Sequence, residues 1–276
     1  MLVVTNKKGD AIMPDYLYSI IGISIIFICT TIGALFSFFF KNKKISPKMN
    51  KIFVGFAAGV MFSASFFSLI MPALETNISY MPPFAVVAIS IILGALFLWS
   101  IDKIVPHFHI NENKDEGIKA KKLSKTSKMF LAVTIHNIPE GLSVGIAFGV
   151  AMSFADNQSL LVGALLLAIG IGIQNIPEGA IVSLPIKGET GSSSKAFLFG
   201  MLSGIVEPIA AVFGLFLAMH IQGIMPWALS FAAGCMIYVV SEEMIPEMSS
   251  DGHDHFGVFA FIFGFVVMLI LDCIKF

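Results

Sequence analysis

Two nearly identical hexapeptides carry most of the chemistry that this sequence offers. Residues 136–141 read His-Asn-Ile-Pro-Glu-Gly, and residues 174–179 read Gln-Asn-Ile-Pro-Glu-Gly. Both lie inside long apolar stretches, and a third acid, Glu207, precedes a proline in another such stretch. Because a charged group near the centre of a membrane costs several kcal/mol, acids in such positions indicate a functional site.

The spacing within each motif places its polar side chains on one face of a helix. His136 and Glu140 are four residues apart, as are Gln174 and Glu178, and residues with this spacing are neighbours on an α-helix. At about 1.5 Å per residue, each pair lies roughly 10 to 16 Å from the same membrane face. Two antiparallel helices would therefore present all four side chains at one level, and Glu207 falls at a similar depth.

The prolines add ligands, because a proline inside a helix leaves the carbonyl four residues earlier without its hydrogen bond. The carbonyls freed in this way belong to Ile135, Ile173 and Gly204. Carboxylate, imidazole and amide groups suit Zn²⁺, Fe²⁺, Mn²⁺ or Cd²⁺ better than Cu⁺, which prefers sulfur. Gln174 alone would be explained by a hydrogen bond to a neighbouring helix. Three carboxylates at one level repel one another unless they are protonated or bound to metal, which favours a metal site.

The composition indicates that these motifs lie in a lipid bilayer. Of the 276 residues, 57% are hydrophobic and only 13% are charged, which excludes a soluble enzyme and disfavours nucleic acid as a partner. Runs long enough to cross a bilayer occur at 16–40, 52–74, 84–105, 129–154, 160–185, 196–219, 224–244 and 256–274. The sequence therefore predicts an all-α membrane protein, a single polytopic domain over residues 1–276 with eight transmembrane helices.

The basic residues predict the orientation. All 17 are lysines, and 14 of them lie at the connections after the first, third and fifth spans. The positive-inside rule places these connections, including a loop over 106–128, in the cytoplasm. Both termini are then outside the cell membrane. Two short clusters near the spans, one with His107 and His109 and one with His253 and His255, are either cation-capturing groups or solvated loops.

The motifs and the number of spans together resemble those of a known family. The paired hexapeptides, Glu207-Pro208 and the eight spans resemble the ZIP (Zrt/Irt-like protein) family of divalent metal transporters, and more closely its short bacterial GufA-like branch. The resemblance implies a 3+2+3 arrangement, in which spans one to three and six to eight form an inverted repeat around spans four and five. It also implies an elevator, in which spans one, four, five and six slide against two, three, seven and eight.

The resemblance further implies a binuclear metal centre. The residues that match its first position are His136, Glu140, Gln174 and Glu178, and those that match its second are Asn137, Asn175 and Glu207. The glutamates of spans four and five would bridge the two metals. Asn175 stands where many members carry Asp, so the second position has one negative charge fewer. Met61 either supplies a thioether to the first position or is an ordinary packing methionine.

We expect a transporter that moves Zn²⁺ into the cytoplasm, with Fe²⁺, Mn²⁺ and Cd²⁺ as further candidate substrates. Glu242 and Glu243 resemble acids of an exit path, or else they are helix-end charges that reach water. The alternative is an intramembrane metal-dependent hydrolase. Against an enzyme, the sequence has no HExxH motif, and the ligands are duplicated in inverted fashion, as alternating access requires. The expected partners are divalent ions and the lipid bilayer, and a homodimer is left open.

Overall fold

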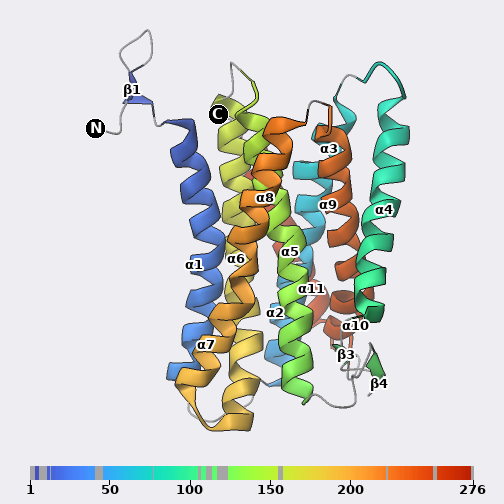
Figure 1. Cartoon of the computed structure of the whole chain (residues 1–276). Helices are drawn as coiled ribbons and strands as arrows, with labels where there is room; N and C mark the ends of the chain where they lie inside the picture. The colour runs from blue at the N-terminus through green and yellow to red at the C-terminus, as the bar shows by residue number, and fades with distance from the viewer. Residues whose placement is uncertain are drawn as a thin grey trace.

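The computed structural model is a helical bundle (Figure 1), and eight helices in its described residues are long and apolar enough to cross a membrane. The structure describes residues 4–5, 11–12, 14–40, 46–76, 78–104, 107–109, 114–116, 124–154, 158–221, 223–250 and 254–274. His253 lies outside the described residues, and for His107 and His109 only the backbone is described. The prediction of an all-α protein with eight membrane-spanning helices is confirmed.

The eight spans comprise single helices and helices built from two or three segments. Five spans are single helices: α1 (Asp15–Phe39), α4 (Pro83–Ile104), α5 (Lys125–Ala151), α6 (Gln158–Thr190) and α11 (Phe256–Cys273). The second span consists of α2 (Pro47–Ala64), η1 (Ser65–Ile70) and α3 (Met71–Leu74). The sixth consists of α7 (Ser193–Gly204) and α8 (Val206–His220), and the seventh of α9 (Met225–Val239), η3 (Val240–Met244) and α10 (Ile245–Met248).

Two small antiparallel hairpins accompany the bundle. The first pairs β1 (Val4–Thr5) with β2 (Ala11–Ile12), and the second pairs β3 (His107–His109) with β4 (Lys114–Glu116). Figure 1 shows the start of α1 and the end of α11 at one end of the bundle, and β3 and β4 toward the other.

Spans two and seven share an irregularity that relates the two halves of the chain. In each, a π-helical segment is followed at once by a short α-helix whose second residue is proline, Pro72 in α3 and Pro246 in α10. A proline ring clashes with the carbonyl four residues earlier and offers it no N–H group. A wider π turn is one way for a helix to accommodate such a misfit. This shared order of a π segment and a proline-containing helix in spans two and seven agrees with an inverted repeat of spans one to three and six to eight.

Close helix contacts divide the spans into two groups. At Gly179 and Gly145, a Cβ atom would overlap a backbone carbonyl of span one and of span six respectively. These contacts join span five to one and span four to six. At Gly59 and Gly94, a Cβ atom would overlap carbonyls of spans eight and seven, which joins two to eight and three to seven. We call spans one, four, five and six the first group, and spans two, three, seven and eight the second.

The outer faces of the bundle are apolar, as a lipid solvent requires. Phe213 on α8, and Phe259 and Phe263 on α11, have more than 60% of their surface exposed. In contrast, Glu140, Gln174 and other polar side chains of the motif helices are fully buried. Glu140 on α5, Gln174 on α6 and Glu207 on α8 therefore face the interior of the bundle.

Candidate metal centre

The two motif helices meet through Glu140 on α5 and Gln174 on α6. The Nε2 atom of Gln174 donates to Oε1 of Glu140 at 2.7 Å, and both side chains are fully buried. Each keeps one further oxygen, Oε2 of Glu140 and Oε1 of Gln174, which has no hydrogen-bond partner among the described residues. The antiparallel pairing that the spacing predicts therefore brings these two side chains into direct contact.

A second polar cluster surrounds Glu207 at the start of α8. Its Oε1 atom accepts hydrogen bonds from Oγ1 of Thr30 at 2.7 Å and from Nδ2 of Asn137 at 3.0 Å. Asn137 also donates to the carbonyl oxygen of Ser203 at 2.9 Å. Spans one, four and six thus converge on one carboxylate, which is fully buried.

The break in span six explains how Glu207 reaches this place. Helix α7 ends at Gly204 and α8 begins at Val206, so the interruption falls just before Pro208, which cannot donate to the carbonyl of Gly204. The prolines of the two motifs, Pro139 and Pro177, lie instead within continuous helices. The helix of span six is therefore interrupted beside its proline, whereas the helices that carry the two hexapeptides are continuous.

Five buried oxygens at this level share one property: they have no hydrogen-bond partner among the residues that the structure describes. They are Oε2 of Glu140, Oε1 of Gln174, Oδ1 of Asn137, Oδ1 of Asn175 and Oε2 of Glu207. Buried polar atoms in proteins are almost always hydrogen-bonded, so each exception needs an explanation. Carboxylate and amide oxygens are ligands for divalent cations, so bound cations would give these oxygens partners.

Asn175 and Glu178 complete the set on α6. The amide nitrogen of Asn175 lies 3.5 Å from the carbonyl oxygen of Ile26, a long contact, and the side chain is 1% exposed. Glu178 is buried and interacts electrostatically with both Glu140 and Glu207. Glu140 and Glu207 also repel each other electrostatically.

His136 has a different partner in this structure. Its Nε2 atom lies 2.8 Å from Oε1 of Glu243, on η3 of the seventh span. Among the described residues, no three His, Cys, Asp or Glu side chains lie close enough together to hold a metal ion. The structure therefore joins Glu140 to Gln174 and Asn137 to Glu207, but it places the His136 imidazole against the second group of spans.

Met61 lies in the main hydrophobic core. It is 1% exposed, packs among the apolar side chains of the bundle, and its carbonyl oxygen accepts a hydrogen bond from Ser65.

Three residues that contact the predicted ligands had no assigned role in the sequence analysis or had a different one. The sequence does not single out Thr30 or Ser203 as site residues. Thr and Ser are common in membrane helices, where their hydroxyl groups usually donate to a carbonyl of the preceding turn. Glu243 was visible as an acid of span seven, but its contact with His136 depends on how two distant helices pack.

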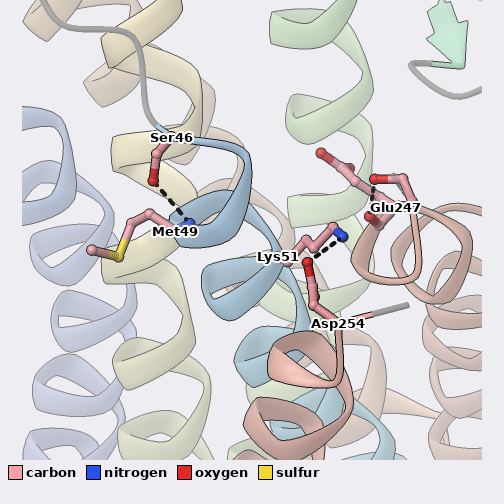
Figure 2. A network of polar contacts seen from close by, with 6 residues as sticks. Ser46, Met49, Lys51, Glu247 and Asp254 are labelled. Carbon is pink, nitrogen blue, oxygen red and sulfur yellow. Dashed lines mark hydrogen bonds and ion pairs between the residues drawn. The ribbon is translucent and has the colours of Figure 1, made fainter. Parts of the chain in front are cut away.

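A further polar network ties the second group together at the end of the bundle where α2 begins (Figure 2). The Nζ atom of Lys51 lies 2.9 Å from Oδ2 of Asp254, and Asn50 donates to Oε1 of Glu247 at 2.8 Å. Lys51 is almost fully buried, whereas the Asp254 side chain is 36% exposed. The hydrogen bond from Lys51 holds the pKa of Asp254 below its ordinary value. This network links α2 to α10 and to the start of α11.

The fold and the site together define a polytopic membrane protein with paired cation-ligand motifs. The family model described as ZIP zinc transporter matches residues 16–129 and 128–272. The chain belongs to this family, as the motifs predict.

The chain is also similar to several characterised relatives. It is 38% identical over 235 residues to zinc transporter GufA of Myxococcus xanthus, which covers 84% of this chain and 89% of that protein. It is 33% identical over 259 residues to zinc transporter ZIPB of Bordetella bronchiseptica, with 92% and 80% covered. It is also 33% identical over 297 residues to zinc transporter ZIP11 of Homo sapiens, with 79% and 86% covered. These relatives are named as transporters and not as enzymes, so the hydrolase alternative has no support.

Proposed function

We propose that this protein carries Zn²⁺ across the membrane into the cytoplasm through a centre formed by the two motifs and Glu207. The observation that carries the proposal is the set of five buried oxygens on spans four, five and six that have no hydrogen-bond partner within the described part of the chain. Buried oxygens without partners are unfavourable, and a bound cation is one way to satisfy carboxylate and amide oxygens. The three relatives described above are named as zinc transporters, which supports Zn²⁺ as the ion.

The centre has two positions in this proposal. The first is built around the contacting pair Glu140 and Gln174, with Glu178 beside them and with His136 joining when it leaves Glu243. The second is built from Asn137, Asn175 and Glu207. Glu178 interacts electrostatically with acids of both positions, which suits a carboxylate that bridges two metals. Met61 would take part in the first position only if its thioether turned out of the hydrophobic core.

The ligand set also allows other ions. Carboxylate and amide oxygens with one imidazole form a hard to borderline set, which accepts Fe²⁺, Mn²⁺ and Cd²⁺ as well as Zn²⁺. Geometry and ligand type, more than intrinsic affinity, separate these metals. We therefore expect Cd²⁺ and Fe²⁺ to compete with Zn²⁺ for uptake.

An elevator movement of the first group against the second is supported by the way the spans contact one another. The close backbone contacts at Gly145 and Gly179 stay within the first group, and those at Gly59 and Gly94 stay within the second. Across the boundary, Gly170 of span five faces the thioether of Met268 of span eight. A flexible methionine side chain adapts to a sliding partner more easily than a backbone carbonyl does.

The orientation follows from the lysines. Lys51 lies near the start of α2, Lys187 near the end of α6 and Lys195 near the start of α7. These helix ends lie opposite to the start of α1 (Figure 1), and the positive-inside rule assigns that end of the bundle to the cytoplasm. Both termini are then extracellular or periplasmic in a cell membrane. The polar contacts of His136 with Glu243, and of Glu247 with Asn50, lead from the centre toward this end. This arrangement agrees with a role of Glu243 in metal exit.

The proposal is tested with purified protein in liposomes that contain a Zn²⁺-sensitive dye. Zn²⁺ added outside should enter vesicles that contain the protein faster than protein-free vesicles, and Cd²⁺ should reduce the rate. No lipid or peptide should be hydrolysed. Vesicles that show no protein-dependent Zn²⁺ entry would refute the proposal. Light scattering of the same preparation would show whether the chain forms a homodimer.

A further inference from the structure

We propose that Thr30 on span one is the positioning residue for Glu207, and that it determines how tightly the second metal position binds. This inference rests on the proposed function, because it treats Glu207 as a ligand. No residue of span one belongs to the two motifs, so Thr30 adds a fourth span to the centre.

The hydrogen bonds of Glu207 are unequally divided between its two oxygens. Oε1 accepts from Thr30 at 2.7 Å and from Asn137 at 3.0 Å, whereas Oε2 has no partner among the described residues. Two donors from different helices fix both the position and the rotation of the carboxylate. One oxygen is thereby held by the protein, and the other is left for a cation.

The Thr30 hydroxyl has two acceptors within reach but only one hydrogen. It lies 2.7 Å from Glu207 and 3.1 Å from the carbonyl oxygen of Ile26, one turn earlier in α1. A hydrogen bond to a carboxylate is shorter and stronger than one to a neutral carbonyl. The hydroxyl therefore donates to Glu207, and the carbonyl oxygen of Ile26 accepts from the backbone of α1.

Packing holds Thr30 in this place. A Cβ atom at Gly204 would lie 2.8 Å from Cγ2 of Thr30, and a Cβ atom at Gly179 would overlap the Thr30 carbonyl oxygen. Span one is thus pressed against spans five and six by two glycines, one at the end of α7 and one in the second motif. The side chain is fully buried and β-branched, so it has few alternative rotamers.

The adjacent residue, Thr31, provides a matched control. Its hydroxyl donates to the carbonyl oxygen of Phe27 at 2.8 Å, the same bond one turn back that Thr30 can make. Thr31 is only partly buried and belongs to a neighbouring face of the helix. Removing its hydroxyl tests the effect of a Thr→Val change in α1 without touching Glu207.

The test measures Cd²⁺ and Zn²⁺ binding to purified protein by calorimetry, in Thr30→Val, Thr30→Ser, Thr31→Val and Glu207→Gln. Groups that orient a metal ligand typically change metal affinity 10- to 100-fold. We expect Thr30→Val to weaken the second binding event by roughly that factor while the first is unchanged. Thr30→Ser, which keeps the hydroxyl, should restore binding, and Thr31→Val should match the wild type. If Thr30→Val fails to fold, Thr30→Ala serves in its place.

The outcomes separate this inference from the proposed function. Equal weakening of both events in Thr30→Val, or no change in either, overturns the role of Thr30. Failure of Thr30→Ser to restore the second event overturns it as well. If Glu207→Gln leaves the second event intact, or if the wild type binds a single metal, the assignment of Glu207 to a second position is wrong and the inference is lost with it.

Discussion

The imidazole Nε2 atom of His136 lies 2.8 Å from the Glu243 carboxylate, and this contact crosses from the first group of spans to the second. The hydrogen bonds of Glu207 with Thr30 and of Glu140 with Gln174 instead stay within the first group. A metal that binds Nε2 of His136 beside Glu140 has to displace Glu243 from that nitrogen. Metal binding through Nε2 and the contact between the two groups therefore compete for the same nitrogen atom.

The first prediction follows from this competition. Glu243→Ala should tighten metal binding at the first position, because His136 no longer has to give up a partner. A hydrogen bond between charged groups contributes about 1.5–3 kcal/mol, so the dissociation constant should fall about tenfold or more. Zn²⁺ flux should fall at the same time, since an acid that receives the ion has been removed.

Glu242 serves as the control, because it is the preceding residue in the same π segment and is exposed. Calorimetry and flux should give wild-type values for Glu242→Ala. Weaker binding in Glu243→Ala would show that Glu243 supports the metal instead of competing with it.

The second prediction concerns charge at Asn175. Its Oδ1 atom is buried without a partner among the described residues, so Asn175→Asp would place a carboxylate at the second position without a large change in shape. A second metal should then bind more tightly, since opposite charges attract strongly at low dielectric. Calorimetry measures the affinity of the second binding event, and elemental analysis after gel filtration measures the stoichiometry. A second event that is no tighter than in the wild type would count against Asn175 as a ligand, and a value of one metal per chain would count against a binuclear centre.

The third prediction tests the orientation in the membrane. Ser79 is exposed in the connection after the second span, and Ser194 is exposed in the first turn of α7, next to the connection after the fifth span. In a protein with Cys273 replaced by serine, Ser79→Cys should react with a membrane-impermeant thiol reagent on intact cells, and Ser194→Cys should react only after lysis. The reverse pattern of labelling would mean that the termini are cytoplasmic.

The fourth prediction concerns the ion pair of Lys51 and Asp254. Because the pKa of Asp254 is lowered in the folded protein, the pair stabilises the fold above the ordinary pKa of an aspartate. This stabilisation is lost as the pH falls through the lower pKa of the folded state. Asp254→Asn should therefore lower the Tm at neutral pH, and its difference from the wild type should shrink below about pH 4. The exposed residue Glu75 provides a control, as Glu75→Gln should leave the Tm unchanged.

Much of the fold could be predicted because a bilayer imposes simple rules on a sequence. Each span needs a long apolar run, and the predicted number of eight is confirmed. The π segments of spans two and seven could not be predicted, because a proline in an apolar run is compatible with a kink, a break or a wide turn. Lys187 shows a similar limit. It was counted as a loop lysine, but it is buried and donates to the carbonyls of Ser37 and Phe40.

Helix periodicity could predict only one part of the candidate site, the pairing of the two motif helices. The contact of Gln174 with Glu140 follows from two antiparallel helices with the same motif. The contact of His136 with Glu243, and that of Thr30 with Glu207, depend on the packing of spans that are far apart in the sequence. Helix periodicity relates residues within one span and does not predict which side chains of distant spans meet.

The most direct test of the central claim is the Zn²⁺ flux of Glu140→Ala in liposomes. Glu140 lies fully buried between Gln174 and the other two acids, where water cannot replace its carboxylate. A transporter that passes the metal through this centre should lose flux to the level of protein-free vesicles. Glu189→Ala, which changes an exposed acid at the end of α6, should retain the wild-type rate. Near-normal flux in folded Glu140→Ala would contradict a metal path through the paired motifs.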